Sequence, residues 1–268
     1  MVESEMIRCG SLFAGIGGFE LGAQWAFEAA GIPHKVLFQV EQNKFCQKIL
    51  NKHWPDAQIF EDVRAVGRHN LPDVDILMGG FPCQDISVAG HQKGIINGKK
   101  SGLWFEMLRI IGELRPRIAV LENVPAVIRV GGPAVVGGLA EIGYDAEWQI
   151  ISAVQFGAPH LRKRWFCVAA DTNGGRYATH TKQTLTEERQ ISPSECSARP
   201  DRRSGASWQK GPIESPLCSM DDGIPNRLAR LRALGNAIVP QCSEFIFNHI
   251  IKNVLQSQQQ KEQQNENR

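Results

Sequence analysis

The sequence predicts an α/β domain built on a doubly wound, mostly parallel sheet. Three observations predict this fold class. Short apolar runs alternate with amphipathic segments through residues 1–170, as is typical of strands joined by crossover helices. A glycine cluster follows the first apolar run, and polar side chains follow several later ones. A length of 268 residues also suffices for one large domain with its own core.

The expected strands are short apolar runs, and the expected helices carry apolar residues at spacings of three and four. Strands are expected over residues 7–13, 36–41, 59–60, 74–78, 118–121, 150–154 and 165–169. Helices are expected over residues 19–30, 44–52, 103–114 and 135–142, and helical periodicity resumes at 228–234 and 238–251.

The overall composition is that of a globular protein without unusual charge. Thirty Lys and Arg against 28 Asp and Glu leave a formal charge of +2, which excludes binding to a polyanion through net charge alone. Seven cysteines without a CxxC pair argue against a disulfide framework and against a zinc ribbon, so no metal site is expected. The start has no secretory apolar region and no apolar run reaches membrane-spanning length. These features predict a soluble, cytoplasmic protein with reduced thiols.

Two segments depart from the α/β pattern. Residues 171–222 are rich in Ser, Thr, Gly, Pro and Arg and contain few large apolar side chains. Two interpretations stay open for them, a surface insertion that is partly disordered and a small recognition element. Residues 256–268 contain no apolar side chain and are expected to form a disordered tail.

The glycine loop at residues 15–18 ends the first strand and opens the first helix. Such loops let a ligand approach the backbone near a helix N-terminus, although a tight turn alone would also use glycine. Glu41 ends the second strand, where an acid can accept hydrogen bonds from ribose hydroxyls, and Asp62 follows the third. Glu20 occupies the place of the third glycine of dinucleotide binders. We expect its carboxylate to repel a pyrophosphate, which favours S-adenosylmethionine over NAD.

Reactive side chains follow the later strands. Cys83 comes after the fourth strand, where a partly exposed thiol could act as a nucleophile. The other six cysteines are expected to be small buried hydrophobic residues. Glu122 ends the fifth strand at the same edge, where it could serve chemistry or cap the next helix. Strand alternation is expected to put Arg162 and Arg164 on one face.

In order along the chain, the motifs FAGIGG, GGFPCQDIS, ENV, GAPHLRKR and LGNAIVP, with the acids at 41 and 62, resemble the cytosine-C5 DNA methyltransferase family. The resemblance covers residues 7–170 and 228–250. It implies a Rossmann-like S-adenosylmethionine-dependent methyltransferase fold with a small irregular recognition insertion. It also implies an enzyme of the prokaryotic or phage type, whose substrate is a cytosine flipped out of duplex DNA.

The resemblance assigns a role to each catalytic group. Cys83 would add to ring position 6 of the cytosine, which makes position 5 electron-rich enough to accept a methyl group from S-adenosylmethionine. Glu122 would protonate or donate to ring N3, and Arg162 and Arg164 would orient Glu122 and the base. The residues implied in cofactor binding are Phe13, Ala14, Gly15, Gly17, Gly18, Glu41, Asp62, Val63, Pro82, Asn236 and Ala237. Those implied in substrate binding are Gln84, Ser87, Lys93, Asn123, Arg202 and Arg203.

The resemblance also implies an organisation and partners. Residues 1–170 and 223–255 would form the catalytic domain, and residues 171–222 a reduced target-recognition region. The expected partner of this monomer is double-stranded DNA, with or without a cognate restriction endonuclease, and no membrane partner is expected. His160 stands where the family has glutamine, and the recognition region is short. A tRNA cytosine-5 methyltransferase and a weakly active DNA-binding homologue therefore remain alternatives.

Overall fold

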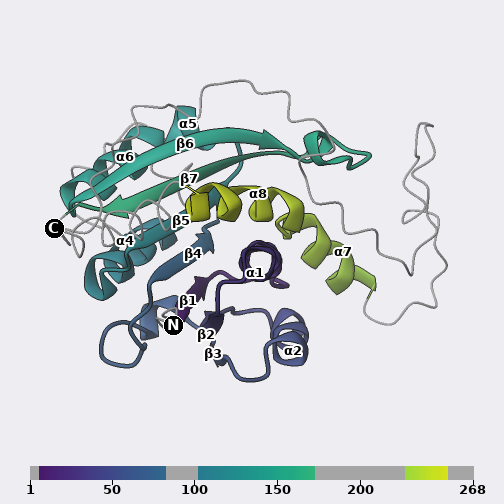
Figure 1. Cartoon of the computed structure of the whole chain (residues 1–268), viewed down its shortest axis with the longest axis horizontal. Helices are drawn as coiled ribbons and strands as arrows, with labels where there is room; N and C mark the ends of the chain where they lie inside the picture. The colour runs from purple at the N-terminus through teal and green to yellow at the C-terminus, as the bar shows by residue number, and fades with distance from the viewer. Residues whose placement is uncertain (1–5, 83–101, 173–226, 253–268) are drawn as a thin grey trace, which may run out of the picture.

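A seven-stranded sheet forms the centre of the computed structural model, which describes residues 6–82, 102–172 and 227–252 (Figure 1). The strand order is β3-β2-β1-β4-β5-β7-β6. The strands are β1 (Ile7–Leu12), β2 (His34–Val40), β3 (Gln58–Phe60), β4 (Ile76–Gly80), β5 (Ile118–Asn123), β6 (Tyr144–Ser152) and β7 (Lys163–Asp171).

The strand directions confirm the doubly wound, mostly parallel fold. The chain winds outward from β1 to β3 in parallel steps, returns to the other side of β1, and adds β4 and β5 in parallel. β7 is antiparallel to both of its neighbours, β5 and β6, so it alone opposes the other six strands. The reversal places the start of β7 beside the carboxyl end of β5, where ligand chemistry gathers in such sheets.

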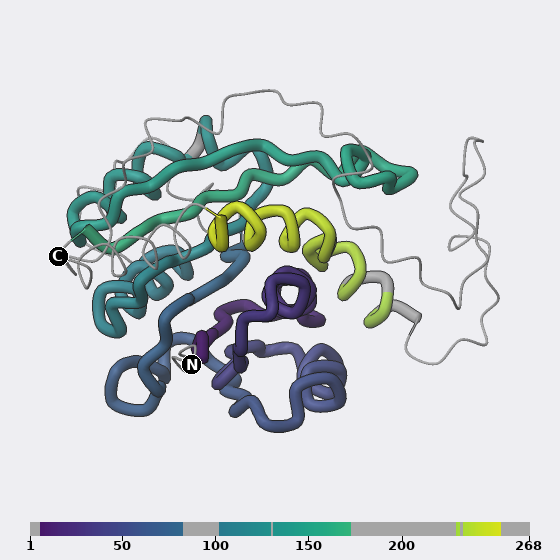
Figure 2. Tube along the Cα trace, viewed as in Figure 1, coloured from purple at the N-terminus to yellow at the C-terminus, as the bar shows by residue number. Residues whose placement is uncertain are grey.

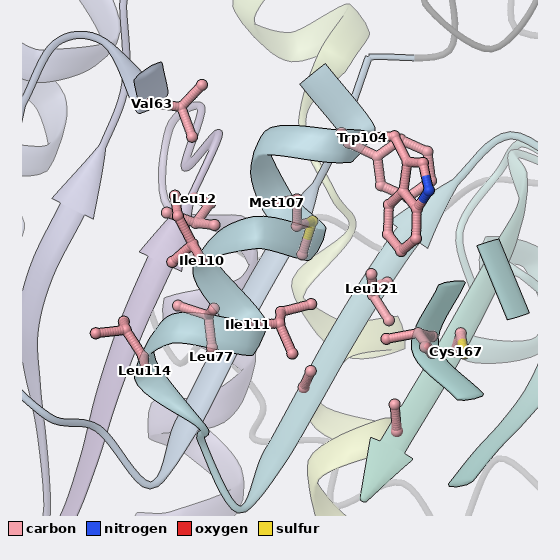
Figure 3. Packing of buried hydrophobic residues seen from close by; sticks show 14 of the residues in the cluster. Leu12, Val63, Leu77, Trp104, Met107, Ile110, Ile111, Leu114, Leu121 and Cys167 are labelled. Carbon is pink, nitrogen blue, oxygen red and sulfur yellow. The ribbon is translucent and has the colours of Figure 1, made fainter. Parts of the chain in front are cut away.

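One face of the sheet packs against α4 (Leu103–Leu114) and α6 (Gly132–Glu141), with the short α5 (Val127–Val130) beside them. Met107, Ile110 and Ile111 of α4 point at the sheet, as Figure 3 shows. Leu77 of β4 and Leu121 of β5 belong to the same cluster of buried side chains. The helical spacing of the α4 residues puts them on one stripe, which explains why the sequence predicted this helix well.

The other face packs against α1 (Gly18–Ala30) and α8 (Pro240–Ile250), which lie side by side (Figure 1). Figure 2 follows the chain from α7 (Arg227–Asn236) into α8 and past α1. Gly22 makes the close approach of the two helices possible, because a Cβ there would lie 2.4 Å from the Pro240 carbonyl oxygen. The C-terminal segment thus completes a core that the first 170 residues leave open. α2 (Lys44–His53) connects β2 to β3.

The expected strand at 150–154 is wrong in its bounds. β6 begins at Tyr144, and the chain turns into the 3-10 helix η2 (Ala153–Phe156) where the strand was expected to continue. β6 lies at the sheet edge and alternates polar and apolar residues, so it contains no continuous apolar run that would reveal it. A capping box between Ser152 and Gln155 starts η2 and ends the strand.

The expectation that the cysteines other than Cys83 are buried is confirmed for the four that the structure describes. Within the described residues, Cys9, Cys46, Cys167 and Cys242 are buried and form no disulfide. Cys83, Cys196 and Cys218 lie outside the described residues, as do most of the recognition insertion and the tail. Within the described ranges, no helix combines the length and apolar character needed to cross a bilayer.

The placement of Glu20 overturns one expectation. Its side chain is fully buried beneath α1 and accepts a hydrogen bond from Gln39 Nε2 at 2.9 Å, so its carboxylate does not face a ligand. Burial raises the pKa of Glu20, and hydrogen bonding from Gln39 opposes that effect. The other carboxylate oxygen of Glu20, Oε2, and the neighbouring Ser11 Oγ and Gln39 Oε1 are buried without a hydrogen-bond partner in the described part of the chain. A protonated Glu20 supplies one donor to this cluster.

We therefore expect the substitution Glu20→Gln to stabilise the protein toward neutral pH. The folded state holds the Glu20 proton more tightly than the unfolded chain, so this group costs stability as pH rises above about 4.3. Glutamine carries no such cost and keeps a donor. The measurement is the thermal midpoint between pH 5 and 8. The control is Glu28→Gln, which makes the same change at an exposed glutamate of the same helix. Equal pH slopes for Glu20→Gln and the wild type would contradict the prediction.

Candidate active site

The conformation of the loop after β1 depends on positive φ angles and on hydrogen bonds to one carboxylate. Phe13, Gly15 and Gly17 all have positive φ, at 56°, 58° and 86°. Glu41, just beyond β2, accepts the Gly15 N–H on Oε2 at 2.8 Å and the Asn43 N–H on Oε1 at 2.7 Å. Its carboxylate thereby ties together the loops after β1 and β2. Each oxygen keeps a further lone pair for a ligand hydroxyl.

The same loop packs tightly where it enters α1. A Cβ at Gly17 would lie 2.3 Å from the Trp54 ring, and one at Gly18 would lie 2.4 Å from the Ile238 carbonyl oxygen. Only glycine fits either position. The contact at Gly18 brings the segment between α7 and α8 beside the glycine loop. Asn236 and Ala237, expected at the cofactor from the sequence alone, lie in or next to that segment.

The third expected cofactor position follows β3. Asp62 caps the 3-10 helix η1 (Val63–Ala65), accepting the Arg64 N–H on Oδ1 at 2.9 Å. Asp62 is exposed, whereas the Val63 side chain is buried. Asp62 Oδ1 is therefore committed to the backbone of η1. Asp62 follows the carboxyl end of β3, and the glycine loop and Glu41 follow the carboxyl ends of the parallel strands β1 and β2.

Glu122 lies near the end of β5 and is buried. Its Oε1 forms an ion pair with Arg164 Nε at 2.9 Å. Burial raises the pKa of Glu122 to about 7, while the positive charges of Arg164 and Arg162 act in the opposite direction. Near neutral pH this carboxyl is therefore divided between its two protonation states. Such a group can both give and take a proton.

Gly80 makes room for this carboxyl group, and the sequence alone did not identify it. Gly80 of β4 lies opposite Glu122 of β5, and a Cβ there would lie 2.7 Å from Glu122 Oε2. Any larger residue would displace the carboxylate. The signal was present in the pair Gly79 and Gly80, because two glycines at the end of a buried strand mark a close approach.

Asn123 is buried next to Glu122 and holds backbone on both sides. Its Nδ2 donates to the Phe81 carbonyl at 2.9 Å, and its Oδ1 accepts the Val124 N–H at 2.8 Å. The bond to Phe81 crosses from β5 to the segment after β4. That segment continues through the exposed Pro82 to Cys83. Asn123 therefore orients the backbone two residues before the expected nucleophile.

Arg162 differs from the expectation that it shares a strand face with Arg164. It precedes β7 with φ at 32°, so strand alternation does not apply to it. Its Nη2 donates to the carbonyl of Gly235 at 2.9 Å and also to that of Ala237. It influences Glu122 through charge, whereas Arg164 contacts Glu122 directly. Arg162 thus holds the segment that packs on the glycine loop.

Six expected site residues lie outside the described part of the chain. They are Cys83, Gln84, Ser87, Lys93, Arg202 and Arg203. The others lie at the carboxyl ends of the parallel strands or in segments packed against that edge, where a nucleotide-like ligand and a proton-transferring carboxyl can share one site.

The strand order and the helices on both faces define a Rossmann-like fold. The structure is similar to that of a DNMT2 mutant from Spodoptera frugiperda, with a TM-score of 0.53 and 18% identity, covering 68% of this chain and 54% of that one. It is also similar to a putative DNA modification methyltransferase encoded within an Escherichia coli prophage, with a TM-score of 0.51 and 22% identity, covering 65% and 49% of the two chains. Both likenesses concern the fold.

The family model of C-5 cytosine-specific DNA methylases matches residues 7–203, and the chain belongs to that family. It is 31% identical over 248 residues to the type II methyltransferase M.CviJI of Paramecium bursaria Chlorella virus IL3A, covering 92% of this chain and 60% of that protein. It is 33% identical over 168 residues to M.Bsp6I of Bacillus sp. strain RFL6, covering 61% and 52%. The matches thus span between about half and 60% of these relatives' length.

We expect Arg164→Gln to raise the pKa of Glu122 further, because the substitution removes the positive charge in contact with it. The measurement is a pH titration of the Glu122 carboxyl carbon by NMR. Lys163→Gln, which removes an exposed charge next to it in sequence, provides the matched control and should leave the pKa near 7. An unchanged or lower value in Arg164→Gln would show that the ion pair does not oppose the effect of burial.

Proposed function

We propose that this protein is a DNA (cytosine-5)-methyltransferase. It transfers a methyl group from S-adenosylmethionine to position 5 of a cytosine flipped out of duplex DNA, through a covalent adduct with Cys83. The observation that carries the proposal is the buried Glu122, whose pKa of about 7 is balanced by Arg164 at the sheet edge that leads into Cys83. Family membership supports the reaction type, and the spare hydrogen-bonding capacity at Glu41 supports the methyl donor.

The residues present fit S-adenosylmethionine. The glycine loop, with half-buried Phe13, Ala14 and Gly15, leaves backbone accessible at the edge of the sheet. Glu41 would accept the ribose hydroxyls, Asp62 and Val63 would meet the adenine edge, and Pro82 would lie beside the bound group. Asn236 and Ala237 would meet the methionine end together with Gly17 and Gly18, in a segment whose carbonyls at Gly235 and Ala237 are bound by Arg162. When bound, this cofactor supplies an electrophilic methyl group on a sulfonium.

The base reacts in three steps. The Cys83 thiolate forms a bond to cytosine C6 while Glu122 donates a proton to N3, which draws electron density out of the ring. C5 would then take the methyl group, and the electron pair of the broken carbon–sulfur bond would stay on sulfur, which leaves S-adenosylhomocysteine. Loss of the C5 proton to a base breaks the bond between sulfur and C6 and restores the aromatic ring, and N3 returns its proton to Glu122. A carboxyl with a pKa near 7 is suited to both directions.

The remaining residues orient these groups. Arg164 holds Glu122 through Nε and the Lys163 carbonyl through Nη1, and its Nη2 would contact the base. Asn123 orients the backbone before Cys83. A target base must leave the helix before it reaches this buried carboxyl, at a cost of a few kcal/mol. Gln84, Ser87 and Lys93 would contact the base and phosphates, and Arg202 and Arg203 would contribute to site recognition.

The first test is methyl transfer itself. The protein incubated with tritiated S-adenosylmethionine should label duplex DNA and leave tRNA unlabelled, and Cys83→Ser should reduce the labelling to background because it removes the nucleophile. Duplex DNA with 5-fluorocytosine should form a covalent adduct that needs both cofactor and Cys83, since that base has no C5 proton to lose. Labelling of tRNA alone would identify an RNA enzyme, and no labelling of either would overturn the proposal.

The second test is the pH dependence of kcat/KM. Glu122 must be protonated to act as an acid, so the active form is present below its pKa and activity should fall about tenfold per pH unit above about 7. Glu122→Gln should lower activity by about 10² to 10⁴ and lose this alkaline limb. DNA affinity measured over the same range separates catalysis from binding. An alkaline limb that persists in Glu122→Gln would assign it to another group.

A further inference from the structure

Arg109 of α4 joins this helix to the segment that follows β3. Its Nη2 donates to the backbone carbonyls of Val63 at 3.1 Å and Val66 at 2.9 Å. On the helix side, Nε donates to Glu106 at 2.9 Å and Nη1 donates to Glu113 at 2.8 Å. One guanidinium thus meets four groups, two of them carbonyls of a loop 43 and 46 residues away in sequence.

Glu113 adds a second connection between the same two elements. Its Oε2 accepts the Arg68 N–H at 3.1 Å, and its backbone carbonyl accepts Arg68 Nη1 at 2.8 Å. Gly67 lies directly against this pair, because a Cβ there would lie 2.3 Å from Glu113 Oε2. The loop from 62 to 68 is therefore attached to α4 by side chains, whereas β3 before it has only three residues.

The peptide unit between Val63 and Arg64 is held from both sides. Arg109 binds its carbonyl oxygen, and Asp62 Oδ1 accepts its N–H at 2.9 Å. A rotation of this unit would move the Asp62 carboxylate with it. The orientation of Asp62 Oδ2 therefore depends on Arg109, although nothing in the sequence motif places the two residues together.

We propose that Arg109 is a positioning residue for the methyl donor, and that it sets the selectivity of the site for an adenine base. This rests on the proposed function, in which Asp62 meets the adenine edge. Adenine carries an amino donor at position 6, which a carboxylate oxygen accepts, whereas hypoxanthine carries a carbonyl oxygen there, which a carboxylate repels. A correctly oriented Asp62 discriminates between the two bases, and a displaced one does not.

Arginine suits this role because its planar fork offers five donors in fixed directions. A lysine at 109 could keep the charge, but its single ammonium cannot meet two helix carboxylates and two loop carbonyls together. Arg109→Lys is therefore the informative substitution. Arg8 provides a matched control, since its side chain donates two hydrogen bonds to Asp75 near the starts of β1 and β4, at the edge of the sheet opposite the site.

The experiment measures the affinities of S-adenosylhomocysteine and S-inosylhomocysteine by calorimetry. We expect Arg109→Lys to weaken S-adenosylhomocysteine about tenfold and S-inosylhomocysteine about twofold or less, so that the preference for adenine falls. Arg8→Lys should leave both affinities within about twofold. If Arg109→Lys does not fold, Glu113→Gln removes the carboxylate that accepts from Arg109 and from the Arg68 N–H. It should also reduce the preference for the adenine compound.

The outcomes separate the two proposals. If the wild-type protein does not bind S-adenosylhomocysteine, the cofactor assignment fails and this inference fails with it. If it binds, but Arg109→Lys weakens both compounds equally or neither, Arg109 has only a structural role and the inference alone is overturned. A selective loss for the adenine compound, absent from Arg8→Lys, supports it.

Discussion

The ion pair between Glu122 and Arg164 is the interaction on which the site depends. Burial favours the neutral carboxyl and raises its pKa, and two arginines favour the ionised form, so the balance lies at about 7. The balance needs the reversed β7, which brings Arg164 to the end of β5. It also needs Gly80, because a side chain there would occupy the place of the carboxyl. A parallel strand in the position of β7 would begin at the opposite edge of the sheet.

A second theme is the use of polar side chains to hold loop backbone. Irregular loops at a sheet edge cannot pair all of their own N–H and C=O groups. Here Glu41 binds amides of two loops, Asn123 binds the carbonyl of Phe81, and Arg162 binds carbonyls near α8. Each bond orients a segment before a ligand arrives, which reduces the ordering cost of binding. Arg109 extends the same device to the loop after β3.

Much of the fold followed from the sequence because its signals are local. The strands β1 to β5 and the helices α1, α2 and α4 follow apolar patterns that a short window contains. β6 was misplaced because an edge strand alternates polar and apolar residues and lacks a continuous apolar run. Glu20 was misjudged because its motif position suggested a ligand, whereas its side chain turns beneath the helix toward Gln39. Arg162 was paired with Arg164 because strand alternation was applied to it, whereas β7 begins one residue later, at Lys163, and Arg162 has a positive φ.

The sequence by itself determined the family, the order of the motifs and the residue types of the site, since these depend on short stretches of chain and on chemical identity. Only the tertiary structure decided which groups meet. The contact of Gly18 with Ile238, the hold of Arg162 on Gly235 and that of Arg109 on Val63 each join residues at least 46 positions apart. The pKa of Glu122 belongs to this class too, because burial and neighbouring charge are properties of the packed sheet edge and not of any motif.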